Sequence, residues 1–138
     1  MPTTHAHDRA LTISRIVSAV MLLAAGGIHL FLVIDGAGGL LGVAFALNFV
    51  AGLVLGVGTL VVSRRLLLAV TALGLAFMAA SLGAIIVSIT VGLLGVQPDW
   101  DYPLIRETAI IESIGVVVLA VATVIAYQER RTRLTPGR

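Results

Sequence analysis

Residues 16–34 read IVSAVMLLAAGGIHLFLVI and contain no Asp, Glu, Lys or Arg. A helix of roughly 20 apolar residues is long enough to cross the hydrocarbon core of a bilayer, which is about 30 Å thick. The stretch is apolar on every side, which is typical of a helix that contacts lipid and other helices. We therefore predict that it crosses a membrane. We also expect it to be retained, because it is longer than the apolar segment of a typical signal peptide.

Three further apolar runs follow, and each predicts a transmembrane helix. They cover residues 40–62, 66–94 and 108–127. At about 1.5 Å per residue, the run 66–94 is longer than the hydrocarbon core is thick. We therefore expect this helix to tilt, or its last residues to unwind or leave the membrane.

Composition supports a membrane protein over a soluble one. The chain has 138 residues, of which 59% are hydrophobic and 12% are charged. A soluble domain is nearer half apolar and a quarter charged, and a small globule cannot bury such long apolar runs. The predicted fold class is therefore all-α, a polytopic membrane protein built as an antiparallel four-helix transmembrane bundle. It occupies residues 16–127, with tails at 1–15 and 128–138.

The arginines predict the orientation of the chain. All nine basic residues are arginine, and cytoplasmic flanks of membrane spans carry an excess of basic residues. With the N-terminus inside, only Arg106 falls outside. The other eight fall on the cytoplasmic side: Arg9, Arg15, Arg64, Arg65, Arg130, Arg131, Arg133 and Arg138. We therefore predict a plasma-membrane protein with both termini in the cytoplasm.

The segments between and beyond the spans are short. On the predicted outer side, residues 35–39 form a glycine-rich turn and residues 96–106 form a longer loop. Asp101 in this loop is expected to cap the N-terminus of the fourth helix, because an Asp side chain accepts from free backbone N–H groups. The polar tail 1–15 is expected to be disordered.

Small residues predict where helices approach closely. Helices in lipid gain no hydrophobic energy from touching one another, so close contact depends on small side chains and polar pairs. The second run is the richest in small residues, which form two neighbouring pairs at a spacing of four: Gly42 with Ala46, and Gly52 with Gly56. We expect the face with Gly52 and Gly56 to contact another helix, in this chain or in a partner subunit.

Polar residues inside the spans gather at one depth. His29 and Glu112 are the ionisable residues inside the four runs, and Asn48 is the chief amide. Counted from the outer ends of their runs, all three lie roughly 7–12 Å below the outer surface, at 1.5 Å per residue. Three charged residues form the rim above this layer: Asp35, Arg106 and Glu107.

Two interpretations of this polar layer stay open. As a pocket, it would bind a small cation or metal ion through His29 and Glu112, or carry a proton, because histidine titrates near neutral pH. As a structural device, His29, Asn48 and Glu112 would hydrogen-bond one another and set the helix register. The cost of burying polar groups falls quickly towards the membrane surface, which favours the structural interpretation.

The sequence argues against most cofactors. It has no cysteine, which excludes disulfides and thiolate metal sites. Haem for electron transfer usually needs two axial ligands, and His29 is the one histidine inside a predicted span. Catalytic zinc needs about three protein ligands, and His5 and His7 in the tail are weak candidates for a metal-binding arm. We predict no cofactor, no metal and no nucleic-acid partner.

Several short motifs are similar to a known group of proteins. Residues 27–30 read GIHL before the glycine-rich turn, residues 45–55 read FALNFVAGLVL, and Arg106-Glu107 precedes Glu112 in the last span. Together these resemble small four-helix integral membrane proteins of actinobacteria, which carry no assigned activity. The resemblance covers most of the chain, although its first outer turn is less aromatic than in typical members. It implies the architecture and a shared polar layer, and no function.

The sequence thus predicts a general role but no substrate or reaction. We expect a non-enzymatic accessory or scaffolding subunit of a membrane complex, because the chain has neither a soluble domain nor a catalytic motif. Its expected partners are the lipid bilayer and either further copies of itself or a larger complex. The alternative is a small transporter or an ion- or proton-conducting oligomer that uses His29 and Glu112.

Overall fold

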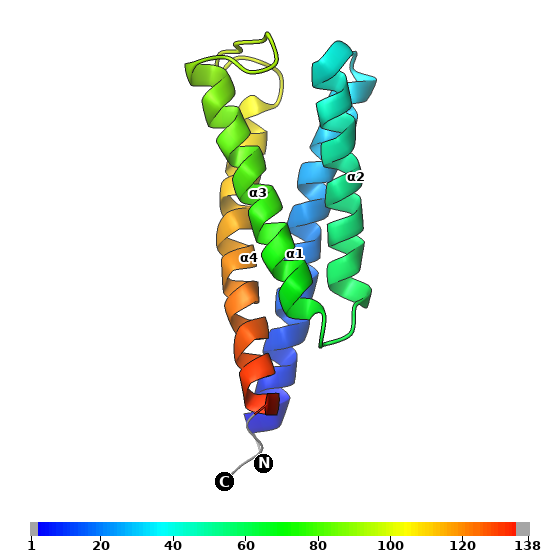
Figure 1. The fold of residues 1–138 in the computed structure, drawn as a ribbon, viewed down its shortest axis with the longest axis vertical. Helices are drawn as coiled ribbons and strands as arrows, with labels where there is room; N and C mark the ends of the chain where they lie inside the picture. The colour runs from blue at the N-terminus through cyan, green and yellow to red at the C-terminus, as the bar shows by residue number, and fades with distance from the viewer. Residues whose placement is uncertain (1–2, 135–138) are drawn as a thin grey trace.

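Four long helices follow the four apolar runs. The computed structural model describes residues 3–134, with the side chains of residues 8–133. The helices are α1 (Thr3–Ile34), α2 (Gly39–Val61), α3 (Leu67–Thr90) and α4 (Ile105–Leu134). They alternate in direction along the bundle (Figure 1), and each is long and apolar enough to cross a membrane. The predicted fold class, an all-α four-helix transmembrane bundle, is confirmed.

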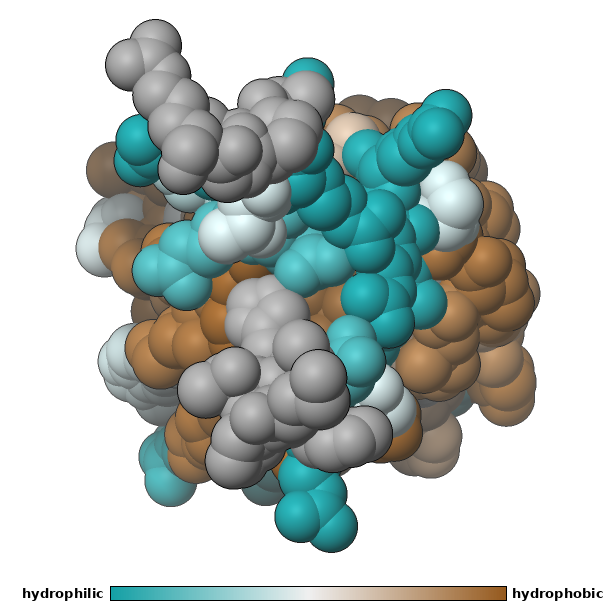
Figure 2. All heavy atoms as spheres, turned by 90° about the horizontal axis from the view of Figure 1, so that it is seen from below, coloured by the Kyte–Doolittle hydropathy of each residue, from teal (hydrophilic) through white to brown (hydrophobic). Residues whose placement is uncertain are grey.

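The two ends of the bundle are unlike. We call the end with the α1–α2 turn and residues 91–104 the loop end, and the end where α1 begins and α4 finishes the terminal end (Figure 1). At the terminal end, hydrophilic side chains gather across the face and apolar side chains flank them (Figure 2).

The helix α3 ends earlier than the run 66–94 suggests. Its last helical residue is Thr90, and Leu94 and Gly95 follow with φ of 56° and 78°. On either side of them, Leu93 and Val96 exchange backbone N–H to carbonyl hydrogen bonds of 2.8 and 3.0 Å. Two successive residues at positive φ are typical of a tight two-residue turn of type I′. The end of the third run therefore unwinds into a loop.

At the terminal end, the helices extend beyond the apolar runs. Residues 3–15 belong to α1, so the expectation of a disordered tail is wrong for them. Leu11 is buried against Leu67 and Ala126, and this tertiary contact stabilises a helix that composition alone does not favour. The side chains of His5 and His7 lie outside the described side chains, so the metal-binding arm stays untested.

Charged side chains at the terminal end tie three segments together. Arg64, in the α2–α3 connection, lies 3.0 Å from Asp8 of α1 and 3.4 Å from Glu129 of α4. Glu129 also pairs with Arg133 at 2.7 Å, one turn further along α4. Arg64 therefore links the connection to both long helices.

We predict that Glu129→Ala lowers the free energy of unfolding by about 1 kcal/mol, because it removes the ion pairs with Arg64 and Arg133, whose side chains are nearly half exposed. Unfolding by increasing mole fractions of SDS in mixed micelles measures this. Asp8→Ala is the matched control, because its side chain is 54% exposed in a single pair. We expect that variant to lose less than about 0.5 kcal/mol. Equal losses in the two variants would contradict the central place of Glu129.

Glycines bring α1 and α2 into backbone contact. A Cβ added at Gly52 would lie 2.8 Å from the Leu22 carbonyl oxygen and 3.0 Å from Gly26 Cα. A Cβ at Gly56 would lie 2.8 Å from Cγ of Leu23. The face with Gly52 and Gly56 thus packs on α1 of the same chain, and small residues on both helices permit the close approach.

The other two small residues of this set lie elsewhere. Gly42 is buried near the start of α2, where a Cβ would overlap the carbonyl group of Ala37 in the preceding turn. Ala46 is half-buried on α2. Gly42 therefore packs on the turn before its own helix and not on another helix.

Candidate functional site

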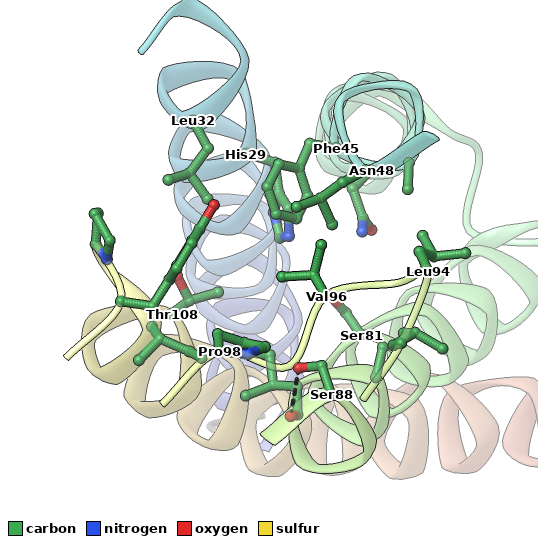
Figure 3. A pocket seen from close by; sticks show the side chains of 18 residues that line it. His29, Leu32, Phe45, Asn48, Ser81, Ser88, Leu94, Val96, Pro98 and Thr108 are labelled. Carbon is green, nitrogen blue, oxygen red and sulfur yellow. Dashed lines mark hydrogen bonds between the residues drawn. The ribbon is translucent and has the colours of Figure 1, made fainter. Parts of the chain in front are cut away.

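A cavity of about 120 Å³ lies at the loop end, between the pair α1 and α2 and the pair α3 and α4. Each helix contributes to its wall, and residues of the loop 91–104 cover it (Figure 3). The cavity forms where α3 leans away from α2 towards the loop end (Figure 1). Its wall is mostly apolar, and six polar side chains line it: His29, Asn48, Ser81, Ser88, Tyr102 and Thr108.

His29 lies on α1, and contacts with Ala25 and Phe45 fix the orientation of its ring. Its Nδ1 lies 2.8 Å from the carbonyl oxygen of Ala25, and its ring packs edge to face on Phe45, with centroids 5.3 Å apart. A carbonyl oxygen only accepts, so Nδ1 carries the hydrogen of this bond. In the neutral ring, Nε2 is then a hydrogen-bond acceptor at the cavity wall.

Behind the wall, Ser81 of α3 meets Glu112 of α4. The Ser81 hydroxyl donates to Oε1 of Glu112 at 2.5 Å. Glu112 is fully buried, and its Oε2 finds no hydrogen-bond partner within the described part of the chain. Buried polar atoms are nearly always paired, so an unpaired carboxylate oxygen next to a cavity is an unusual feature.

The start of α4 differs from the expected capping. The helix begins at Ile105, four residues after Asp101, so the prediction that Asp101 caps it is wrong. Asp101 instead forms an ion pair of 2.6 Å with Arg106. The Thr108 hydroxyl donates to the carbonyl oxygen of Leu104 at 2.6 Å, and this side chain lines the cavity.

The predicted polar layer divides into two parts. His29 and Asn48 line the cavity, and Glu112 lies behind Ser81. No hydrogen bond joins His29, Asn48 and Glu112 to one another in the described residues, because His29 bonds its own helix and Glu112 bonds Ser81. The mutual hydrogen bonds that the structural interpretation expects are therefore not formed, and Glu112 bonds the neighbouring helix through Ser81 instead.

The three rim residues do not belong to the cavity wall. Asp35 and Glu107 are exposed, and neither lines the cavity. Arg106 turns towards the loop, where its Nε donates to the carbonyl oxygen of Trp100 at 2.9 Å and its guanidinium pairs with Asp101. Arg106 thus holds the covering loop at the start of α4.

Ser81 was not predicted from the sequence, because its depth depends on where α3 ends. Counting depth from residue 94 places Ser81 roughly 20 Å below the end of its run, near mid-membrane. Counting from the observed helix end at Thr90 places it roughly 13 Å below, in the same layer as the other polar residues. Ser81 therefore belongs to the polar layer because α3 ends at Thr90 and not at residue 94.

An apolar core lies between the polar layer and the terminal end. Leu22, Met78 and Leu119 are fully buried and belong to one cluster. Each of them lies on its helix between the polar layer and the terminal end. Met78, for example, precedes Ser81 on α3 by three residues. A Cβ added at Gly115 would lie 2.8 Å from Cε of Met78, so Met78 fills a notch just beyond Glu112. This packing separates the cavity from the buried polar residues nearer the terminal end.

The chemistry of the site is that of a small amphipathic pocket. Ligand sites are typically apolar with a few placed polar groups, and this wall fits that description. Among the described side chains, no three His, Asp or Glu residues gather closely enough to hold a metal ion. Comparisons of the chain with protein-family models, curated proteins and solved structures gave no match.

Proposed function

We propose that the chain is a non-enzymatic accessory subunit of a complex in the plasma membrane, and that it holds a small ligand in the loop-end cavity. The observation that carries this proposal is the cavity itself, in which polar side chains converge within an apolar wall. Polar and ionisable groups are expensive inside a span, so His29 and Glu112 at such a place indicate a use.

Binding fits these contacts better than catalysis does. Nucleophilic catalysis needs a nucleophile, a base and a group that orients the base. Ser81 donates to Glu112, but no third residue orients that carboxylate in the described part of the chain. His29 is bonded to the backbone of its own helix and not to Ser81. These contacts support a binding role without a reaction.

We predict that Ala84→Phe abolishes ligand retention, because Ala84 lines the cavity and the larger ring would fill it. Native mass spectrometry of protein extracted in mild detergent measures a bound molecule as an added mass. The control is Val87→Phe on the same helix, because Val87 is exposed. We expect the added mass in the wild type and in this control, and none in Ala84→Phe. Equal retention in all three proteins would contradict the pocket.

The accessory role rests on the outward faces of the bundle. Large apolar side chains on α2, such as Val43, Leu47 and Val54, are more than half exposed in the single chain. Such faces contact lipid or neighbouring helices. Affinity purification after mild detergent extraction should recover further subunits or copies with the chain. Recovery of the monomer alone under several extraction conditions would contradict this role.

Buried Glu112 is the observation that favours a second candidate, a small transporter or an ion- or proton-conducting oligomer. A conducting path needs polar groups across the whole membrane, and the core of Leu22, Met78 and Leu119 interrupts such a path within one chain. A flux assay in liposomes that compares the wild type with Glu112→Gln tests this candidate. Flux that depends on Glu112 would favour it over the binding role.

We also propose that the loop end faces outwards and that both termini are cytoplasmic, because the arginine bias supports this orientation. The chain has no cysteine, so single-cysteine variants report on one position each. We expect a membrane-impermeant maleimide to label Asp99→Cys in intact cells. Thr132→Cys should be labelled only after the cells are made permeable. The reverse pattern would overturn the orientation.

A further inference from the structure

Two side chains of the cavity wall, His29 and Ser81, offer hydrogen-bond acceptors to a ligand. The hydrogen on Nδ1 is engaged by the carbonyl oxygen of Ala25 at 2.8 Å. The neutral ring therefore offers Nε2 to the cavity as a lone pair and not as a donor. Burial and the edge contact with Phe45 hold the ring in this orientation. On the side of α1, a ligand meets an acceptor.

Ser81, on the wall opposite His29, also offers a hydrogen-bond acceptor. A hydroxyl has one hydrogen and two lone pairs, and the hydrogen of Ser81 is used in the bond to Glu112. Ser81 also lines the cavity, so its remaining capacity there is that of an acceptor. The hydrogen bond to the carboxyl group behind it polarises the Ser81 hydroxyl, which strengthens this preference.

The rest of the wall limits the size and polarity of the ligand. Leu32, Phe45, Ile85 and Val96 line the cavity with apolar surface. A volume of about 120 Å³ is close to that of an engineered apolar cavity of about 150 Å³ that holds benzene in another protein. The space therefore fits a polar head group with a short apolar body.

Together these observations lead to a ligand class. We propose that the cavity binds a small amphipathic amine, whose N–H groups donate to Nε2 of His29 and Oγ of Ser81, or a small amphipathic alcohol, whose one O–H donates to either of them. This inference rests on the proposed binding function and adds the chemistry of the ligand to it. A molecule that only accepts hydrogen bonds can meet the donors of Asn48 and Tyr102 in the wall, but it leaves Nε2 of His29 and Oγ of Ser81 without a donor in a partly desolvated site.

Protection of a single cysteine from labelling tests the ligand class. Ser88 lines the cavity, and the chain has no other cysteine, so Ser88→Cys in nanodiscs reports on the cavity through its rate of reaction with methyl methanethiosulfonate. Benzylamine and benzyl alcohol are the donor probes, and acetophenone, benzoate and toluene are probes of similar size without a matching donor. Val91→Cys is the control for partition into lipid, because Val91 is exposed and outside the cavity wall.

We expect the donor probes to half-protect Ser88→Cys at concentrations about tenfold lower than acetophenone or toluene, the ratio that a well-placed hydrogen bond can supply. They should not protect Val91→Cys. Adding Ser81→Ala should remove most of this preference, whereas Ser81→Thr, which keeps a hydroxyl, should retain it. This pair of variants separates loss of the acceptor from loss of the fold.

Two results would overturn the inference in different ways. If acetophenone or benzoate protects as well as benzylamine, the ligand class is wrong while the pocket stands. If no probe protects, and Ala84→Phe leaves the labelling rate of Ser88→Cys unchanged, the proposed binding function fails together with the ligand class.

Discussion

Gly52→Ala is expected to destabilise the bundle by about 1–3 kcal/mol, the usual cost of forcing an extra methyl group into a close contact. The added Cβ would lie 2.8 Å from the Leu22 carbonyl oxygen and 3.0 Å from Gly26 Cα. Both neighbours are backbone atoms and cannot rotate away, so α1 and α2 must move apart. Unfolding with SDS in mixed micelles measures the loss of stability.

Gly27→Ala provides the matched control for this substitution. Gly27 is also a helix-interior glycine, and a Cβ there meets nothing within 4 Å. The control should therefore be neutral, or more stable by up to about 1 kcal/mol, because alanine favours the helix over glycine. If the two substitutions had the same effect, the close approach of α1 and α2 at Gly52 would be disproved.

Ser81→Ala is expected to cost about 1–3 kcal/mol, because it removes the hydrogen bond that Glu112 accepts and leaves a buried carboxyl group unpaired. Glu112 is fully buried, and its Oε2 already has no partner in the described residues. The same SDS titration measures this loss. Adding Glu112→Leu to Ser81→Ala should recover stability, because replacing both partners of a buried polar pair by apolar groups can be nearly neutral.

Ser113→Ala controls for the loss of a serine hydroxyl in a span. Ser113 is exposed, and its hydroxyl donates to the Ala109 carbonyl oxygen within the same helix. We expect this change to stay within about 0.5 kcal/mol. A Ser81→Ala variant as stable as Ser113→Ala would show that the pair with Glu112 contributes nothing to the fold.

The ends of the helices show where the prediction from sequence was limited. The end of α1 is local, because Gly36 with φ of +110° follows the last turn and glycine adopts this conformation without steric cost. The end of α3 was harder to predict, because residues 91–96 are as apolar as the helix before them. The start of α1 depended on a contact between Leu11 and Ala126, which are far apart in the sequence.

The sequence predicted the depth of the polar residues in the membrane, but not which side chains hydrogen-bond each other. Depth follows from counting residues at a fixed rise, so His29, Asn48 and Glu112 could be assigned to one level of the membrane. Rotation about each helix axis is a separate quantity, and helices that are apolar all round carry little signal for it. For this reason the bond between Ser81 and Glu112 was not predicted.

The sequence by itself thus determined that the chain forms four apolar helices long enough to cross a membrane, because a span needs only length and composition. The tertiary structure decided which faces meet. It packs Gly52 on Gly26, encloses a cavity under the loop 91–104, and separates that cavity from the terminal end with a core that includes Met78. Those outcomes depend on how the helices rotate and pack, and packing is set by the shapes of several side chains at once.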